Sequence, residues 1–414
     1  MSRPALAFRA FKRDERGAFA AIAAIGMPVA ISAAVLGTEV GLYTYRHQAM
    51  QGAADAAAIT AIVSGASGAT LVTQARAVAA AQGFVHGAAN VTVTINSPPT
   101  SGSYMTKTGA VEAIVSQPQQ PILAKIFSSA SVSVRARAVA ILNPGGACLL
   151  ALNGTASGAI SLQGVSTVTL TGCDAFSNSS STSAISAGGS SKLSVNKALA
   201  VGSIPVDANI TTTAGPPKGG QNLAPDPYAS KSFESFNGCK QSYTGGNVTL
   251  QPGVYCNGIS LTAGAKVSMA PGVYYLDSSD LKVAGNATLT GAGVTIVFTS
   301  SKGKNYGSAS IASNAIINLS APTSGPTAGI VLFGDRAMPA GTSFKLTGGG
   351  TQQWTGAIYL PQGDLTYAGG ASGGAGCTQI IANTVTFTGT SNLSMSCAGS
   401  NIQPAGNQIA VLVE

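Results

Sequence analysis

The sequence predicts an N-terminal transmembrane α-helix, then a small α+β unit, then an all-β domain wound as a right-handed parallel β-helix. An uncharged, mostly apolar stretch over residues 17–38 indicates the helix. Alternating apolar and polar residues over 90–143 are typical of strands, and short β-type runs separated by Gly, Asn and Ser recur after residue 147. A β-sandwich is the alternative for this last part, because the lengths between recurring runs are irregular.

The apolar stretch is long enough to cross a bilayer. At 1.5 Å per residue, a helix over 17–38 covers roughly 30 Å, the thickness of the hydrocarbon core. The segment 1–16 that precedes it is basic, and its Lys and Arg residues are Arg3, Arg9, Lys12, Arg13 and Arg16. This excess of positive charge predicts that 1–16 is cytoplasmic in a single-pass inner-membrane protein, with the C-terminal bulk periplasmic or at the cell surface.

The helical pattern continues beyond the apolar stretch. Residues 39–64 hold helix formers and no Pro, so the transmembrane helix over 17–45 is predicted to continue to about residue 64. Glu39 marks the outer edge of the lipid or, alternatively, contacts a partner there. A cleaved signal peptide is the other interpretation of the N-terminus, but the long apolar run and its continuing helix favour an uncleaved anchor.

Residues 46–143 are predicted to form a helix followed by a small sheet. After a turn at 65–68, an Ala-rich run predicts a second helix, and period-two alternation with Thr, Val and Ile predicts strands. The predicted elements are a helix over Leu71–Phe84, strands over Val91–Ile95, Val111–Ser116 and Ser131–Leu142, and a helical turn at Pro121–Phe127.

The β-helix is predicted over residues 148–405. The motif P-G-V-Y occurs at Pro252–Tyr255 and again at Pro271–Tyr274, and a repeat near twenty residues with Gly and Asn corners is typical of a solenoid. Alternate Val, Ile and Leu side chains would fill its interior. The stretch Gly215–Pro227 is predicted to be an irregular loop that either leaves the solenoid surface or divides the solenoid into two halves.

All the cysteines fall after residue 147, where an oxidising exterior would let them pair. They are Cys148, Cys173, Cys239, Cys256, Cys377 and Cys397. Sequential pairing is favoured because neighbouring coils are adjacent in space, although six cysteines allow fifteen connectivities. The absence of C-x-x-C, and histidines only at His47 and His86, argue against a zinc site, and the sequence indicates no metal and no cofactor.

The charged residues argue against nucleic-acid binding and against catalysis. Residues 1–16 alone carry net +3 of the net charge of +8, and the remaining excess is thinly spread with no basic run, so nucleic acid is not an expected partner. An exported polysaccharide lyase or hydrolase is the alternative function, since β-helices often carry such enzymes. Only Asp277 and Asp280 lie close together among the later carboxylates, and Asp335 is expected to pair locally with Arg336, so no catalytic residue is assigned and the protein is predicted not to be an enzyme.

The N-terminal residues FKRDERGAFAAIAAIGMPVAISAAVLGTEVGLYTYRHQAMQGAADAAAITA resemble a known family. They are similar to the N-terminal segment of TadG-like proteins of the Tad/Flp (tight-adherence) pilus assembly system. Arg16 and Gly17 match the family's R-G before the span. The match to its Q-x-A-A-D-A-A-A helix motif covers Gln51, Ala53, Ala54, Asp55, Ala56, Ala57 and Ala58.

The resemblance implies a membrane helix before a small pilin-like sheet, partners among other pilus-system proteins, and a role in surface attachment. Cleaved prepilins usually carry Glu five residues after the cut, whereas a cut after Gly17 would put Ile22 there, so cleavage at Gly17 is not expected. We therefore expect a membrane-anchored pilus component that displays its β-helix for pilus assembly, anchoring or adhesion. An outer surface rich in Ser, Thr and Asn also suits surface glycans.

Overall fold

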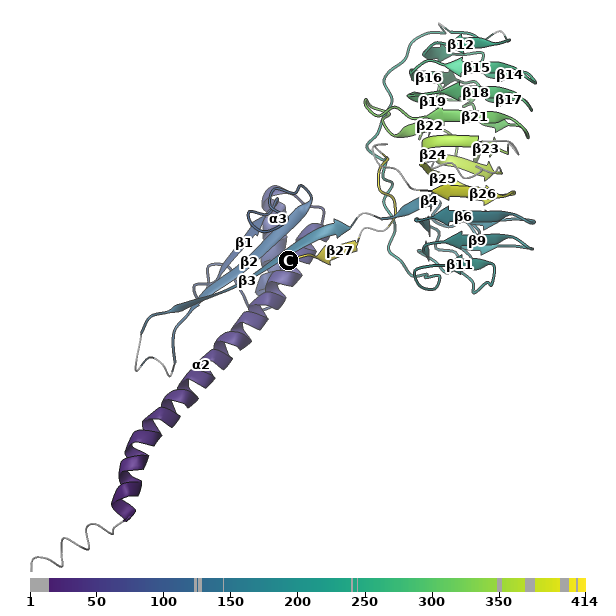
Figure 1. Ribbon diagram of the computed structural model, residues 1–414. Helices are drawn as coiled ribbons and strands as arrows, with labels where there is room; N and C mark the ends of the chain where they lie inside the picture. The colour runs from purple at the N-terminus through teal and green to yellow at the C-terminus, as the bar shows by residue number, and fades with distance from the viewer. Residues whose placement is uncertain are drawn as a thin grey trace, which may run out of the picture. The chain divides into compact units, whose positions relative to one another are not determined.

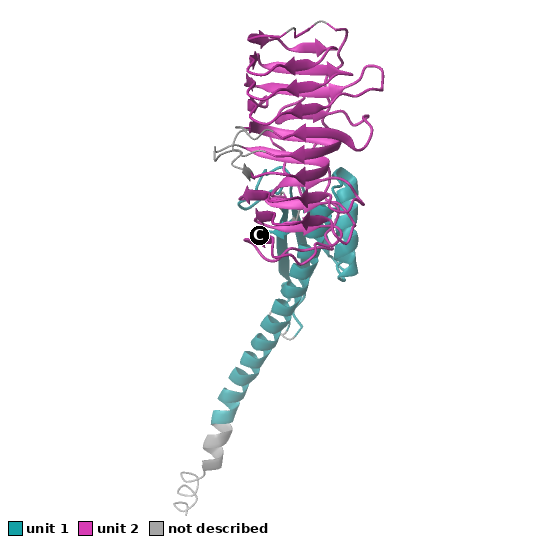
Figure 2. Ribbon diagram, turned by 90° about the vertical axis from the view of Figure 1, so that its right-hand side faces the viewer, with its two compact units in different colours: residues 1–143, 409–414 teal, residues 144–408 magenta. Residues whose placement is uncertain are grey.

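The computed structural model describes residues 15–122, 125, 129–143, 145–239, 241–243, 245–347, 352–368, 377–394, 402–406 and 409–414, with the backbone alone for 15–21, 143, 391–394 and 409. The chain divides into two compact units (Figure 2). Unit 1 comprises residues 1–143 and 409–414, and unit 2 comprises residues 144–408. Residues 1–14 of the predicted cytoplasmic segment 1–16 lie outside the described residues.

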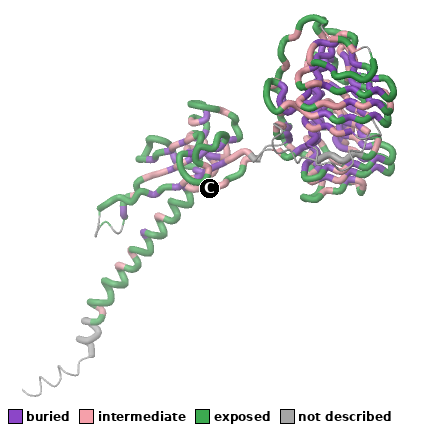
Figure 3. Tube along the Cα trace, turned by 45° about the horizontal axis from the view of Figure 1, so that its top comes forward, coloured by how far each residue is buried: buried purple, intermediate pink, exposed green. Residues whose placement is uncertain are grey.

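Unit 1 begins with one helix of 49 residues, α2 (Glu15–Val63), which continues through Pro28. Its part from Ile22 onward is long and apolar enough to cross a membrane. From Ile22 to Ala49 most side chains are exposed, with Ile25 74% and Leu36 61% accessible, whereas many from Met50 onward are buried (Figure 3). The predicted single helix from the apolar stretch into the sixties is confirmed.

The rest of unit 1 is a second helix and an antiparallel sheet (Figure 1). The elements are α3 (Gly68–Ala81), β1 (Thr92–Asn96), β2 (Ala110–Gln119), β3 (Val132–Asn143) and β27 (Ile409–Leu412), with strand order β1-β2-β3-β27. The predicted second helix and three strands are confirmed to within a few residues. Strand β27 was not predicted, and most of the turn predicted at Pro121–Phe127 lies outside the described residues.

A charged cluster joins β2 to β3 on the sheet face opposite the helices. The fully buried carboxylate of Glu112 accepts hydrogen bonds from Asn96 Nδ2 at 2.6 Å and Thr100 Oγ1 at 2.8 Å, and from Arg137 Nε at 2.5 Å. Arg137 Nη1 also contacts Glu414 Oε2 at 2.6 Å. Burial opposes ionisation of Glu112, but the hydrogen bonds from Asn96, Arg137 and Thr100 outweigh it and lower its pKa to about 2.

Unit 2 is a mostly β body of short strands. The part before residue 213 contains β4 (Ala147–Ala151), β5 (Ile160–Leu162), β6 (Thr167–Thr171), β7 (Asp174–Ser177), β8 (Ile185–Ala187), β9 (Lys192–Val195), β10 (Ala198–Ala200) and β11 (Ile210–Thr212). The later part contains β12 (Val248–Leu250), β13 (Gly253–Tyr255), β14 (Ile259–Leu261), β15 (Lys266–Met269), β16 (Gly272–Asp277), β17 (Leu281–Val283), β18 (Thr288–Gly291), β19 (Val294–Thr299), β20 (Ala309–Ile311), β21 (Ile316–Ser320), β22 (Ile330–Gly334), β23 (Thr342–Leu346), β24 (Gln352–Tyr367), β25 (Thr378–Phe387) and β26 (Ser391–Ser394).

These strands pair in parallel, and most of them pair with the strand three positions further along the chain. β12 pairs with β15, β13 with β16 and β14 with β17, and the pattern continues as far as β24. Figure 2 shows the resulting layers of strands in unit 2. Every strand pair described within unit 2 is parallel, unlike the antiparallel pairs of a β-sandwich. The interior is apolar and contains the fully buried Trp354, Phe298 and Phe344.

The order of the layers differs from the order of the chain. Strand β25 pairs with β24 on one side and with β4 and β5 on the other, so the end of the unit stacks against its beginning. The chain therefore starts in the middle of the stack, winds to one end at β11, and crosses to the opposite end at β12 (Figure 1). A parallel bridge between Gly146 and Ala405 places the two ends of unit 2 side by side.

The repeated P-G-V-Y motif forms a corner that stacks on the next corner. Val248 lies beside Val267 as the repeat predicts, but Gly253 lies beside Tyr274 and not beside Gly272. Strands β12 and β15 therefore pair at an offset of 19 residues, whereas β13 and β16 pair at an offset of 21 residues. A Cβ added to Gly272 would lie 2.4 Å from Pro252 Cγ, so this corner needs glycine for close approach.

We expect Gly272→Ala to destabilise unit 2 by about 1–3 kcal/mol, because φ at Gly272 is +142° and the new Cβ would overlap Pro252. Trp354 is the single tryptophan and is buried in unit 2, so its fluorescence during urea unfolding reports on this unit. Gly154→Ala is the control, because nothing lies within 4 Å of its added Cβ. Equal unfolding midpoints for the two variants would contradict the stacked corner.

We expect Glu112→Gln to lower the stability of unit 1 near neutral pH by on the order of 2–3 kcal/mol. The pKa of Glu112 is lowered from 4.5 to about 2 on folding. Its contribution is therefore fully present above about pH 4.5 and is lost as pH falls through about 2. Helical circular dichroism at several pH values follows unit 1, which contains both described helices. The variant should lose much of this acid dependence, whereas Asp280→Asn in unit 2 should keep it.

Candidate functional site

The family-motif positions lie on α2 and join this helix to the sheet of unit 1. Gln51 Nε2 donates to Asp55 Oδ1 at 2.7 Å and to the carbonyl oxygen of Arg137 on β3 at 3.0 Å. The alanines of the motif whose side chains are fully buried against the sheet are Ala53, Ala54, Ala57 and Ala58. Arg16 and Gly17 lie in the first turns of α2, where the backbone alone is described.

Two of the three predicted disulfides are confirmed. Cys148 bonds to Cys173 and Cys239 bonds to Cys256, at sequence separations of 25 and 17. Cys377 is itself disulfide-bonded. Cys397 lies outside the described residues, so its pairing with Cys377 stays a prediction. The confirmed bonds indicate that unit 2 forms in an oxidising compartment.

Two outer faces of unit 2 carry rows of polar side chains. On one face, residues in register form a row that we call the Thr/Asn ladder: Thr249, Ser268, Thr290, Asn318 and Gln353. On another face, the Ser/Lys ladder consists of Ser260, Lys282, Ser310, Lys345, Thr366, Thr386, Ser161 and Ser186. Because neighbouring parallel strands lie roughly 4.8 Å apart, each ladder repeats hydrogen-bonding groups at a regular spacing.

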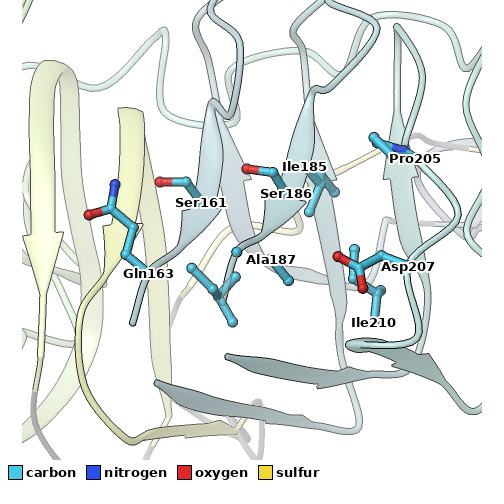
Figure 4. Close-up of a pocket in the computed structure, with 10 residues that line it drawn as sticks. Ser161, Gln163, Ile185, Ser186, Ala187, Pro205, Asp207 and Ile210 are labelled. Carbon is cyan, nitrogen blue, oxygen red and sulfur yellow. The ribbon is translucent and has the colours of Figure 1, made fainter. Parts of the chain in front are cut away.

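A pocket of about 240 Å³ lies at the end of the Ser/Lys ladder (Figure 4). Its polar lining comes from Ser161, Gln163, Ser186 and Asp207, and Asp207 Oδ1 accepts a hydrogen bond from the Asn209 amide at 2.8 Å. Figure 4 shows the hydroxyls of the two serines on neighbouring strands pointing the same way. A wider groove of about 520 Å³ lies over the Thr/Asn ladder. The pocket offers hydroxyl, amide and carboxylate groups, and the groove offers hydroxyls, the Asn247 amide and the Lys266 ammonium, which suits a polyhydroxyl ligand in both.

The third outer face of unit 2 is apolar. Its row of outward side chains in register is Val254, Tyr275, Val297, Phe333, Tyr359, Ile381, Leu150, Phe176 and Leu199. The connection from β11 toward β12, residues 213–239, covers this row and is here called the strap. Phe233 of the strap meets Phe333 edge-on at 5.4 Å between ring centroids, and Phe236 stacks on Tyr275 at 4.9 Å.

The strap decides between the two alternatives predicted for Gly215–Pro227. Gly215–Pro227 joins the two halves of unit 2, as one alternative held, but it does not leave the surface, because Ala224 is buried against the apolar face. A sequence signal for this covered face exists in unbroken apolar runs such as IVLFG over 330–334, every residue of which is buried. Such runs are typical of strands covered on both sides.

Arg336 holds the strap in place. Its Nε donates to Tyr359 Oη at 2.8 Å, its Nη1 donates to the carbonyl of Lys231 at 2.8 Å, and its Nη2 donates to the carbonyl of Tyr228. Tyr359 in turn donates to Asp226 Oδ2 at 2.8 Å. Burial raises the pKa of Tyr359, which keeps this phenol protonated as a donor.

The local ion pair predicted between Asp335 and Arg336 is wrong for the part of the chain that the structure describes. Asp335 instead accepts hydrogen bonds from Thr299 Oγ1 at 2.6 Å and from the Ala337 amide at 2.9 Å, while Arg336 faces the strap. An aspartate at the start of a turn commonly accepts a hydrogen bond from a backbone amide two residues later, as Asp335 does here. The carbonyls that the Arg336 guanidinium binds are remote in sequence, so sequence proximity did not reveal them.

The two carboxylates considered for catalysis accept hydrogen bonds from nearby turns. Asp277 accepts hydrogen bonds from the amide and hydroxyl of Ser301 at 2.7 and 2.6 Å, and Asp280 accepts from the Ser308 amide at 2.9 Å and contacts Lys282 Nζ at 3.0 Å. Among the described residues, no group of three or more His, Cys, Asp or Glu side chains is placed to hold a metal ion.

Comparison of the chain with protein-family models, with curated proteins and with solved structures found no match. A proposal of function therefore rests on the helix, the covered face and the two polar ladders described above.

We expect Arg336→Met to loosen the strap, because three charge-assisted hydrogen bonds are lost. Trypsin should then cut after Lys231 roughly tenfold faster or more, since cleavage follows the population of the opened strap. Lys345→Met removes an exposed cation from the Ser/Lys ladder and serves as the control. An unchanged cutting rate at Lys231 in Arg336→Met would contradict the role given to Arg336.

Proposed function

We propose that this protein is a membrane-anchored component of a tight-adherence (Tad/Flp) pilus system that displays unit 2 outside the cytoplasm for pilus assembly, anchoring or adhesion. The observation that carries this proposal is that the two halves of α2 differ in exposure. Its first half exposes apolar side chains such as Ile25 and Leu36, and its second half buries the Q-x-A-A-D-A-A-A motif against a small sheet. This is the arrangement that the resemblance to TadG-like proteins implies.

In this proposal the exposed half of α2 spans the inner membrane once, with residues 1–16 in the cytoplasm and the bulk of the chain in the periplasm or at the cell surface. Support comes from the length and hydropathy of the helix, from the basic residues before it, and from the Cys148–Cys173 and Cys239–Cys256 bonds, which need an oxidising compartment.

Unit 2 in this proposal is a right-handed parallel β-helix that serves as a rigid display surface. Support comes from its parallel pairing of every third strand and from its interior of stacked apolar side chains. The Thr/Asn ladder and the Ser/Lys ladder are the surfaces that would bind glycans or other pilus-system proteins, because they repeat hydroxyl and amide groups along the stack. The third face is already covered by the strap.

Fractionation and adherence assays test the proposal together. We expect the full chain in the inner-membrane fraction, co-purification with the major pilin, and loss of surface adherence when the gene is deleted. A double variant, Thr249→Glu with Thr290→Glu, should reduce adherence while leaving the protein in the membrane, because it adds charge to one ladder only. Val165→Glu is the control, since Val165 is 81% exposed outside both ladders.

A soluble cytoplasmic protein would contradict the anchor. Wild-type adherence after deletion would contradict the role in attachment.

A further inference from the structure

The connection between β2 and β3 touches α2 at the residue that follows its uncharged stretch. Glu39 is only 3% exposed, and its Oε1 accepts a hydrogen bond from the Ile122 amide at 2.6 Å. This contact within the chain adds to the two roles considered for Glu39 from the sequence, the outer edge of the lipid and a partner contact. Strands β2 and β3 extend alongside α2 (Figure 1), and their connection reaches the helix well before its buried part begins at Met50.

The residues around this contact are apolar and basic. Ile122 is 67% exposed and Val132, at the start of β3, is 48% exposed. On the helix, Leu36 and Val40 are each 61% exposed on either side of Glu39. Lys125 is also exposed. Exposed apolar side chains beside an apolar helix, with a cation close in sequence, match the composition of the lipid–water interface.

Burial of Glu39 gives a second, independent reason to place lipid here. A carboxylate at the edge of a bilayer is costly unless it is paired or hydrated. Glu39 is almost fully buried, and the Ile122 amide supplies a backbone donor to its charge. Water itself stabilises the charge of an exposed carboxylate, whereas a carboxylate at the depth of the acyl chains needs hydrogen-bond donors from the protein.

We propose that Ile122 and Val132 form a second membrane contact, which we call the interfacial tip. In this arrangement the two side chains enter the headgroup–acyl boundary beside α2, and Lys125 lies among anionic headgroups. The tip and the span together fix the depth of the helix at Glu39. This inference rests on the proposed function only in requiring that α2 span the bilayer.

Tryptophan fluorescence in vesicles tests the interfacial tip. The full chain is reconstituted in phosphatidylcholine–phosphatidylglycerol vesicles whose acyl chains carry bromine near the headgroup, and the emission of the parent chain, from Trp354 alone, is subtracted. We expect at least a twofold loss of the added emission for Ile122→Trp and for Val132→Trp. Val165→Trp, 81% exposed in unit 2, should keep its emission. Leu36→Trp reports on the span itself.

The outcomes separate the two proposals. Quenching of Leu36→Trp without quenching of Ile122→Trp or Val132→Trp overturns the interfacial tip and leaves the anchor standing. Absence of quenching at Leu36→Trp overturns the anchor and the tip together. Quenching at Leu36 and at either tip position, with none at Val165, supports the tip. Two tip positions are used so that a folding defect in one variant leaves the other to decide.

Discussion

The structure depends on one topological constraint, that unit 2 must begin and end at the same place. Strand β27 returns after unit 2 to pair antiparallel with β3, so unit 2 is an insertion between two neighbouring strands of unit 1. The parallel bridge between Gly146 and Ala405 meets this constraint. Coils stacked in chain order would leave the two ends of unit 2 at opposite ends of the stack. The chain instead starts in the middle, and β25 closes the gap against β4 and β5.

This permuted order requires a long connection back across the stack, and the strap is that connection. A segment that crosses so many layers needs a surface on which to bury its own backbone and side chains. The apolar row from Val254 to Leu199 supplies that surface, and Arg336 satisfies two carbonyls of the strap that the apolar row leaves without donors. One of the three outer faces is thereby used by the chain itself, which leaves the two polar ladders for contact with other molecules.

Much of this architecture was readable from local sequence, and the rest depends on contacts between distant residues. The uncharged stretch and the Ala-rich motif predicted α2, and the spacing of Cys148 from Cys173 predicted a bond between neighbouring coils, because helix periodicity and coil length are local properties. Strand β27 is a short apolar run with nothing to show that its partner is β3. The Ile122 amide that donates to Glu39 and the carbonyls bound by Arg336 come from segments remote in sequence. The covered face left a usable signal in its unbroken apolar strands, but the segment covering it, rich in Gly and Pro, reads as an ordinary loop.

The same insertion links the folding of the two units. Until residues 409–412 pair with it, one edge of β3 is unpaired, and unpaired edges invite wrong partners. Strand β27 covers that edge, and Glu414 then contacts Arg137, which also holds the buried Glu112. Unit 1 is thus completed by residues that lie beyond unit 2 in the chain.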